Sequence, residues 1–282
     1  MGIVNVTPDS FSDGGLYLDA DAAVAHGHQL LADGADLVDV GGESTRPGAP
    51  PVDADEERRR VEPVVRELSD IGASVSIDTS KATVAEAALD AGARIVNDVT
   101  AFVADPELAD VCAARGCGVV LMHMQGTPRT MQENPTYDDV VEDVRAFLAA
   151  RIEFAVARGV EEDAIWVDPG IGFGKTVEHN LELLRRLGEL RALGRPILIG
   201  TSRKSFLGKL TGREAQARLG GTIASNVIAL ANGAEVLRVH DVAPMRDALV
   251  VAGAILGRRP WGTDERFAAG SRDEVDRPRE TG

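Results

Sequence analysis

The sequence predicts an α/β fold, a (β/α)8 TIM barrel that forms a single domain over residues 1–257. Eight short runs rich in valine and isoleucine alternate with eight amphipathic stretches, and no low-complexity linker interrupts them. Apolar runs without polar alternation are typical of parallel strands that are buried on both faces. An open doubly wound sheet is the main alternative, but it usually has about five to seven strands and needs a point where the strand order reverses.

The first half of the chain supplies four strand–helix units. We expect strands at 2–6, 37–40, 75–77 and 95–97, and helices at 20–32, 55–68, 84–91 and 106–114. Gly72, Gly92 and Gly116 follow the last three helical stretches, and Gly34 lies between the first helix and the second strand. A helix that ends in a left-handed residue usually has glycine at that position. These glycines therefore mark the boundaries between helices and strands.

The second half repeats the same pattern. We expect strands at 119–122, 165–167, 197–199 and 236–239, and helices at 137–157, 177–190, 213–232 and 242–255. The helix-to-strand turns again contain glycine, and the phrase Asn-Gly-Ala at 232–234 resembles Asp-Gly-Ala at 33–35 and Ala-Gly-Ala at 91–93. Eight such units within about 250 residues are what a TIM barrel requires.

Composition narrows the class of protein. The 282 residues are 44% hydrophobic and carry a formal net charge of −15. This charge argues against nucleic acid or an anionic membrane surface as a partner, and no run approaches the ~20 apolar residues of a membrane helix. Without a signal peptide, and with only Cys112 and Cys117, the chain is expected to be cytoplasmic with reduced thiols. Residues 258–282 lose their apolar content and are expected to form a disordered tail.

Polar residues stand where each predicted strand ends, which is where TIM barrels carry their active sites. Asp78, Asn97 and Asp168 offer several acceptors and one amide, a set that suits a flat heterocycle with N–H donors. For any one of these positions, capping of the next helix is an equally ordinary role. The recurrence of polar or glycine-rich turns after all eight strands favours a site.

A group of cationic residues also follows these strands, although any one of them could instead belong to a surface ion pair. Because these cationic residues are concentrated at one face of the barrel, they predict a bound phosphate or pyrophosphate. An Mg2+ ion held partly by phosphates needs few protein oxygens, and Asn5 could supply one. The cationic residues are Arg46, Arg203, Lys204, Arg238 and His240.

Together these segments resemble the dihydropteroate synthase family. The phrases that carry the resemblance span nearly the whole predicted barrel, and those at 1–15, 41–48 and 168–175 are the most specific. The others lie at 78–81, 95–98, 121–126, 202–205 and 238–242. The chain begins almost at the first strand, so the short N-terminal hairpin that often plugs this barrel is expected to be truncated or absent.

The resemblance implies a reaction and its site. Members of the family join a dihydropterin-methyl diphosphate to 4-aminobenzoate with Mg2+, usually as homodimers, and are the targets of sulfonamides. It implies pterin diphosphate binding by Thr45, Arg46, Asp78, Asn97, Asp168, Lys204, Arg238 and His240. Of these, Asp78, Asp168, Lys204, Arg238 and His240 are implied to be catalytic. It implies 4-aminobenzoate binding by Thr45, Pro47, Phe173 and Ser202, and Mg2+ binding by Asn5.

Two other functions remain open on the sequence. A pterin-binding methyltransferase that acts with a corrinoid protein would keep the fold and the pterin pocket. A paralogue without activity could bind pterin or serve as an assembly partner. The phosphate-facing residues Arg46, Arg238 and His240 argue against the first, and the complete polar set argues against the second.

Overall fold

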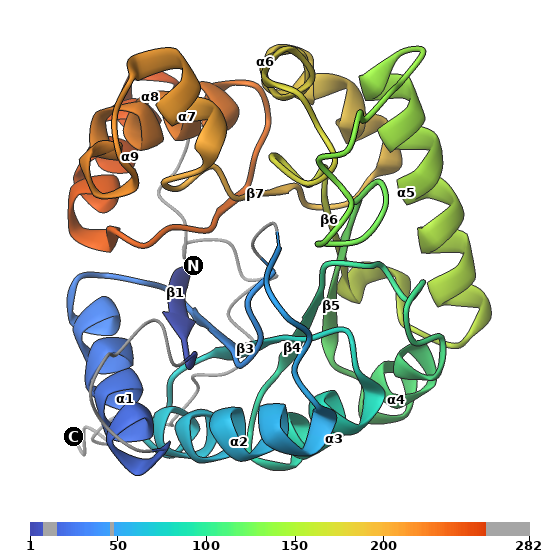
Figure 1. Cartoon of the computed structure of the whole chain (residues 1–282), viewed down its shortest axis with the longest axis vertical. Coiled ribbons are helices and arrows are strands. Elements are labelled where there is room, and N and C mark those ends of the chain that lie inside the picture. The colour runs from blue at the N-terminus through green and yellow to red at the C-terminus, as the bar shows by residue number, and fades with distance from the viewer. Residues whose placement is uncertain (8–15, 46–47, 258–282) are drawn as a thin grey trace, which may run out of the picture.

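Eight strands and their helices alternate along the chain in the computed structural model, which describes residues 1–7, 16–45 and 48–257 (Figure 1). The predicted tail at 258–282 lies outside the described residues. Each strand falls within a residue or two of its predicted position. The strands are β1 (Gly2–Asn5), β2 (Val38–Gly41), β3 (Val75–Asp78), β4 (Ile95–Asp98), β5 (Gly118–Met122), β6 (Ile165–Asp168), β7 (Leu198–Ile199) and β8 (Val236–Leu237).

The strands close into a ring, which confirms the barrel and excludes the open sheet. Strands β1 to β6 pair in parallel in chain order, and β7 pairs in parallel with β8. Two isolated parallel bridges join these sheets, Val167 to Ile197 and Gly2 to Val239. At the second junction the Ile3 N–H donates to the Val239 carbonyl at 3.1 Å. Every strand therefore has a neighbour on both sides.

The helices surround the strands in Figure 1, and the glycines predicted to end them do so. Their φ angles lie between +59° and +116°, the left-handed region that disfavours residues with a Cβ atom. These glycines are Gly34, Gly72, Gly92, Gly116, Gly159, Gly194 and Gly233. The first five helices are α1 (Leu16–Ala32), α2 (Ala54–Asp70), α3 (Ala82–Asp90), α4 (Glu107–Arg115) and α5 (Val140–Ala157).

The later helices differ from the prediction. The stretch 177–190 divides into α6 (Val177–Arg185) and a 3-10 helix, Leu187–Leu193. The predicted helix at 213–232 begins later, as α8 (Leu219–Ala231), and the last helix is α9 (Val242–Ile255). A short helix that the pattern missed, α7 (Ser205–Thr211), ends at Gly212, whose φ is +71°. Seven residues are too few for a helical period to stand out in a sequence.

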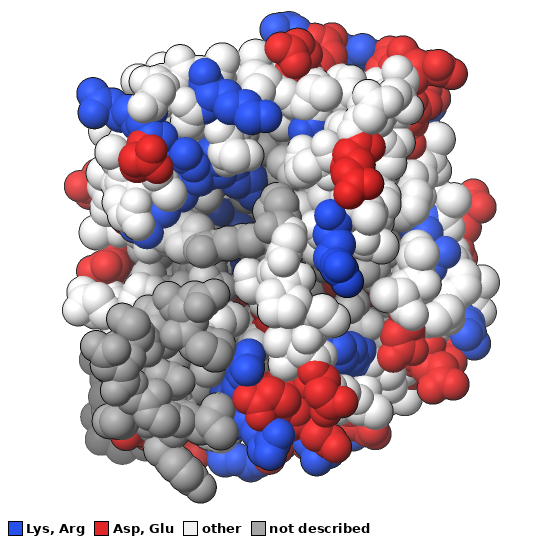
Figure 2. All heavy atoms as spheres, viewed as in Figure 1, with Lys and Arg blue, Asp and Glu red and all other residues white. Residues whose placement is uncertain are grey.

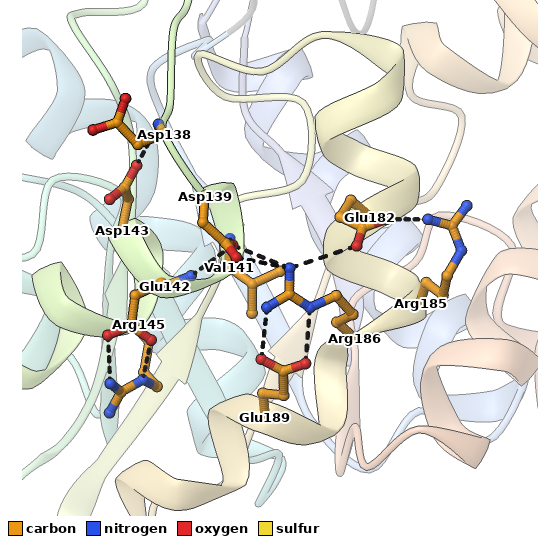
Figure 3. Close-up of polar contacts among 10 residues, drawn as sticks. All are labelled: Asp138, Asp139, Val141, Glu142, Asp143, Arg145, Glu182, Arg185, Arg186 and Glu189. Carbon is orange, nitrogen blue, oxygen red and sulfur yellow. Dashed lines mark hydrogen bonds and ion pairs between the residues drawn. The ribbon is translucent and has the colours of Figure 1, made fainter.

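An ion-pair network fastens α5 to α6 on the outside of the ring (Figure 3). The Arg186 guanidinium lies 3.0 Å from Asp139 Oδ2 and 2.8 Å from Glu189 Oε1. Asp139 also caps α5, because its carboxylate accepts the Val141 N–H at 2.9 Å. A groove of about 500 Å³ runs beside this network, between α5 and α6. The ion pairs of the network are exposed to solvent and lie beside the helices rather than at the carboxyl ends of the strands. They therefore contribute mainly to local order.

The barrel interior changes from an apolar layer to a more polar layer two residues further along the strands. One layer is apolar and buried, and it consists of Met1, Leu37, Ile95, Val120, Trp166, Leu198 and Val236. Residues two positions later point to the same side of a strand. Two positions later the strands carry Ile3, Asp39, Asn97, Met122, Asp168, Gly200 and Arg238. The polar layer thus lies toward the carboxyl ends of the strands, above a packed apolar floor.

None of the helices that the structure describes is long and apolar enough to span a membrane.

Gly170 provides a test of the turn that follows β6. Its φ is +68°, and a Cβ atom there would lie 1.9 Å from the His123 carbonyl oxygen. We expect Gly170→Ala to lower the free energy of unfolding by at least about 2 kcal/mol, because a steric clash adds to the left-handed backbone cost. Chemical denaturation measures this loss.

The matched control is Gly116→Ala. Gly116 has a similar φ of +59°, but a Cβ atom there meets nothing within 4 Å. The control should lose only about 1 kcal/mol, the conformational cost alone. Equal losses for the two variants would show that the turn can move away from the His123 carbonyl.

Candidate active site

An arginine between two carboxylates forms the centre of the polar layer. Arg238 Nε lies 2.6 Å from Asp39 Oδ2, and Arg238 Nη2 lies 2.8 Å from Asp78 Oδ2. The Asn97 side-chain amide donates to the same Asp39 oxygen at 3.0 Å. These side chains come from β2, β3, β4 and the end of β8, so one cluster joins both sides of the seam where β8 meets β1.

Burial shifts the pKa of the Asp78 carboxyl group toward neutral pH. It raises the pKa of Asp78 to about 7, with Arg238 opposing the rise and Asp39 adding to it. Asp39 is completely buried, and its Oδ1 has no hydrogen-bond partner among the described residues. A buried acceptor of this kind is costly unless a donor reaches it. The cluster therefore retains unused capacity to accept hydrogen bonds.

Asp168 and Lys204 provide a second pair of opposite charges. Asp168 ends β6 and accepts the Gly170 N–H at 2.7 Å. Burial raises the pKa of Asp168, although the nearby Lys204 opposes that rise. Burial also lowers the pKa of Lys204 to about 8, against the opposing effect of Asp168. Burial thus disfavours the charged form of each side chain, and the interaction between the two favours it.

Two glycines adjoin these charged groups. Gly41 ends β2 opposite Asp78, and a Cβ atom on it would lie 3.4 Å from the Asp78 Cβ. Gly200 follows β7, and a Cβ atom there would lie 3.9 Å from Lys204 Nζ. A methyl group at either position would therefore contact one of these charged side chains.

Hydrogen bonds from side chains hold the loop between β6 and α6, and three of the four donors come from other parts of the chain. Four successive carbonyls of this loop, at residues 171–174, each accept a hydrogen bond from a different side chain. The donors are Lys204 Nζ, Gln132 Nε2, Lys175 Nζ and Tyr137 Oη, in that order. This arrangement fixes Phe173 near the site, with Lys204 Nζ 4.5 Å from the centre of its ring.

Lys175 and His123 are a buried pair to which the sequence analysis gave no role. Lys175 Nζ lies 2.9 Å from His123 Nδ1 and 2.9 Å from the Phe173 carbonyl oxygen. Burial lowers the pKa of Lys175 well below its usual range. Burial, aided by Lys175, lowers the pKa of His123 to about 3, so this imidazole is neutral at physiological pH. The pair connects the end of β5 to the loop that carries Phe173.

A further ion cluster supports the loop after β2. Lys81 Nζ contacts both Glu43 Oε2 and the buried Glu57 Oε2. The other Glu43 oxygen accepts the Val52 N–H at 3.2 Å, so one carboxylate connects the two ends of this loop. Thr45 lies within the loop and is partly buried, whereas Arg46 and Pro47 lie outside the described residues.

Arg203, one of the cations predicted at the rim, forms an ion pair. The Arg203 guanidinium contacts both carboxylate oxygens of Asp241, with Nε 3.0 Å from Oδ2. Beside it, Ser202 Oγ lies 2.9 Å from His240 Nδ1. Positive side chains gather on the face in Figure 2 over the part of the ring that contains α7 and α8. Acidic side chains are more numerous over α2, α3, α5 and α6 in that view.

Five of the predicted site residues lie in or beside the polar layer, and Asp39 is a sixth residue of this layer that the sequence did not predict. The five are Asp78, Asn97, Asp168, Lys204 and Arg238. Asp39 was missed, although a charged residue inside the apolar run 37–40 was a usable signal, because a buried strand tolerates a carboxylate only with a partner.

Metal ligands are sparse in this region. The described residues contain no group of three or more His, Cys, Asp or Glu side chains that could hold a metal ion. Asn5 ends β1, opposite Gly41, and is partly exposed. One amide oxygen fits Mg2+ only if a ligand's phosphates provide most of the coordination.

Comparison with known proteins agrees with this geometry. A family model described as pterin binding enzyme matches residues 1–240. The dihydropteroate synthase of Mycobacterium leprae is 50% identical over 267 residues, which cover 92% of this chain and 94% of that protein.

Solved structures extend the similarity to three dimensions. Xanthomonas albilineans dihydropteroate synthase with 4-aminobenzoic acid is 48% identical, with a TM-score of 0.85 over 92% of this chain and 93% of that chain. Yersinia pestis dihydropteroate synthase in a sulfonamide drug complex is 44% identical, with a TM-score of 0.86 over 91% and 93%. The chain therefore belongs to the pterin-binding enzymes and, among them, to the dihydropteroate synthase family.

Proposed function

We propose that this protein catalyses the dihydropteroate synthase reaction of folate biosynthesis. It would join (7,8-dihydropterin-6-yl)methyl diphosphate to 4-aminobenzoate, giving 7,8-dihydropteroate and pyrophosphate. The observation that carries the proposal is the polar layer, in which Asp78 contacts Arg238, Asn97 contacts Asp39, and Asp168 interacts electrostatically with Lys204. Family membership makes this layer the expected position of the pterin ring.

The layer suits a pterin because that ring presents several N–H donors in one plane. In this proposal the carboxylates of Asp78 and Asp168 accept hydrogen bonds from the ring. The Asn97 amide is held by Asp39 and presents its carbonyl oxygen as a further acceptor. Lys204 offers N–H donors to the ring's own acceptors. Since Asp39 and Arg238 already orient these groups, little reorganisation is needed on binding.

The diphosphate would lie toward the rim, near Arg238 and His240. The family resemblance adds Thr45 and Arg46 to these contacts. Asn5 is the one protein ligand that we propose for Mg2+, with the diphosphate oxygens completing the coordination. When bound, Mg2+ would neutralise part of the charge on the diphosphate.

The 4-aminobenzoate site would be formed by Phe173, Ser202, Thr45 and Pro47. The fixed carbonyls of the β6–α6 loop keep the Phe173 ring in place, so one wall of this site exists before the ligand binds. The X. albilineans and Y. pestis structures hold 4-aminobenzoic acid and a sulfonamide drug, respectively. We infer that sulfonamides compete with 4-aminobenzoate here.

The reaction begins when the C–O bond to the diphosphate breaks and pyrophosphate leaves with the electron pair. The pterin methylene becomes a cation that the ring delocalises. The ionised carboxylates of Asp78 and Asp168 stabilise that positive charge, while Arg238 and His240 stabilise the departing anion. The amine of 4-aminobenzoate then attacks the methylene carbon and releases its proton to solvent. No protein nucleophile and no strong base are needed.

The proposal includes a cytoplasmic homodimer. Exposed apolar side chains are concentrated on α8 and α9, which pack against each other, and such patches favour association. The large apolar side chains that are exposed on these two helices are those of Leu219, Ile228, Val250, Val251 and Ile255. Cys112 and Cys117 are both buried free thiols, as expected in a reducing compartment.

Release of pyrophosphate that depends on both substrates and on Mg2+ is the decisive measurement. We expect Asp168→Asn to weaken binding of the pterin diphosphate at least about tenfold, because the amide loses charge and turns one acceptor into a donor. Asp163→Asn is the control, since Asp163 is fully exposed in the 3-10 helix Glu162–Ala164. Methyl transfer to a corrinoid protein without pyrophosphate release would overturn the proposal, as would absence of turnover.

The pH profile should reflect two shifted groups. Asp78 is ionised only above its pKa of about 7, and Lys204 is charged only below its pKa of about 8. If both charged forms are required, kcat/KM for the pterin diphosphate rises up to about pH 7 and falls above about pH 8. The residual activity of Lys204→Arg should lack the alkaline fall, because arginine stays protonated. A flat profile from pH 6 to pH 9 would contradict these roles.

The interface on α9 can be tested with matched valines. Val251 is 60% exposed on α9, and Val103 is 59% exposed before α4. We expect Val251→Glu to raise the dimer dissociation constant at least about tenfold in analytical ultracentrifugation, because it places a charge in an apolar contact. Val103→Glu should leave the dimer intact. A monomeric wild-type protein would exclude the dimer altogether.

A further inference from the structure

Arg203 adopts a left-handed backbone conformation although it is not glycine. Its φ is +57°, and it lies between Ser202 and Lys204 in the turn that joins β7 to α7. This conformation costs a residue with a Cβ atom roughly 1–2 kcal/mol. Such strain persists only where surrounding contacts determine the geometry, and it often occurs at functional sites.

Three separate groups of Arg203 have such contacts. Its N–H donates to Thr222 Oγ1 at 3.1 Å, and its carbonyl accepts from Arg218 Nη1 at 2.9 Å. Its guanidinium forms the two-pronged ion pair with Asp241. Arg218 is held in turn by the Arg213 carbonyl at 2.9 Å. The turn is therefore fastened to α8 and to the segment before α9.

The residues on either side of Arg203 both reach the site. Ser202 Oγ lies 2.9 Å from His240 Nδ1 and accepts the His240 N–H at 3.2 Å. Lys204 Nζ donates to the Ile171 carbonyl and lies over the Phe173 ring. Asp241 directly follows His240, so the Arg203–Asp241 pair joins the turn that carries Ser202 to the turn that carries His240.

We propose that Arg203 is a positioning residue that sets the places of Ser202, Lys204 and His240 around the substrates. The proposal rests on the proposed function, and it assigns Arg203 an indirect role. The alternative is a direct contact between the Arg203 guanidinium and the diphosphate. The two-pronged pair with Asp241 favours the indirect role, since the fork of the guanidinium already faces a carboxylate.

Two substitutions separate the backbone from the side chain. Arg203→Gly removes the guanidinium but tolerates the left-handed conformation, whereas Arg203→Ala removes the guanidinium and adds backbone strain. Asp241→Asn breaks the ion pair and leaves Arg203 free. If Arg203 positions its neighbours, Arg203→Gly and Asp241→Asn should each lower kcat/KM for both substrates by about ten- to a hundredfold. Arg203→Ala should have the lowest kcat/KM of the three variants. The double variant that combines Arg203→Gly with Asp241→Asn should lose little more activity than either single variant.

Arg246→Ala is the matched control. Arg246 forms a comparable ion pair with Asp36, with 3.2 Å between Nη1 and Oδ2, but Asp36 precedes β2 and so lies at the opposite end of the strands from the site. It should keep wild-type kinetics. Thermal denaturation checks that each variant is folded. If Arg203 instead contacts the diphosphate, Asp241→Asn should retain activity while Arg203→Gly loses affinity for the pterin diphosphate alone, and that result would overturn the proposal.

A second readout does not depend on turnover. The His240 ring resonances, assigned by comparison with His240→Gln, should shift in Asp241→Asn and Arg203→Gly but not in Arg246→Ala. Unchanged resonances would overturn the positioning role. If the wild-type protein releases no pyrophosphate, the proposed reaction fails, and the spectra still decide whether Arg203 positions His240.

Discussion

The polar interior of this barrel depends on one arginine that serves two carboxylates. Asp39 and Asp78 lie on neighbouring strands, and both contact Arg238 from the far side of the seam between β8 and β1. Buried carboxylates are tolerated only with such a partner, and removal of one member leaves an uncompensated charge. Closure of the ring and construction of the site are thus the same physical problem, because neither carboxylate can be buried unless β8 brings Arg238 to it.

The loops around this cluster are constrained by contacts rather than by regular structure. Left-handed residues, such as Gly170 and Arg203, allow sharp turns, and side chains from distant segments then saturate the exposed backbone groups. Three carbonyls of the β6–α6 loop are held in this way, and a fourth accepts from Lys175 within the loop. A site whose dipoles are already oriented has little reorganisation to perform during a reaction. The packed layer that contains Trp166 and Leu198 provides the floor for this arrangement.

The proposed chemistry needs both signs of charge within a short distance. A cationic pterin intermediate favours nearby carboxylates, whereas the departing pyrophosphate favours arginine and histidine. The layer provides both because Asp78 and Arg238 are in contact, and Asp168 and Lys204 influence each other's pKa in opposite directions. The protein as a whole carries a net charge of −15, so an anionic substrate finds its attraction only locally, where the cationic side chains gather.

The sequence by itself determined the fold class, the order of the strands and most of the polar layer. Periodicity and helix-ending glycines are local signals. The strand-end rule of TIM barrels placed Asp78, Asn97 and Asp168 in a predicted ligand site, and Lys204 and Arg238 in a predicted phosphate-binding rim. Only the tertiary structure decided which charges are paired. Asp39 appears in the sequence as part of an apolar run, and Arg203 appears as one of several rim cations, yet one contacts Arg238 and the other contacts Asp241. Asp39 and Arg238 are 199 residues apart, and no local pattern encodes such a contact, because it arises only when the ring closes.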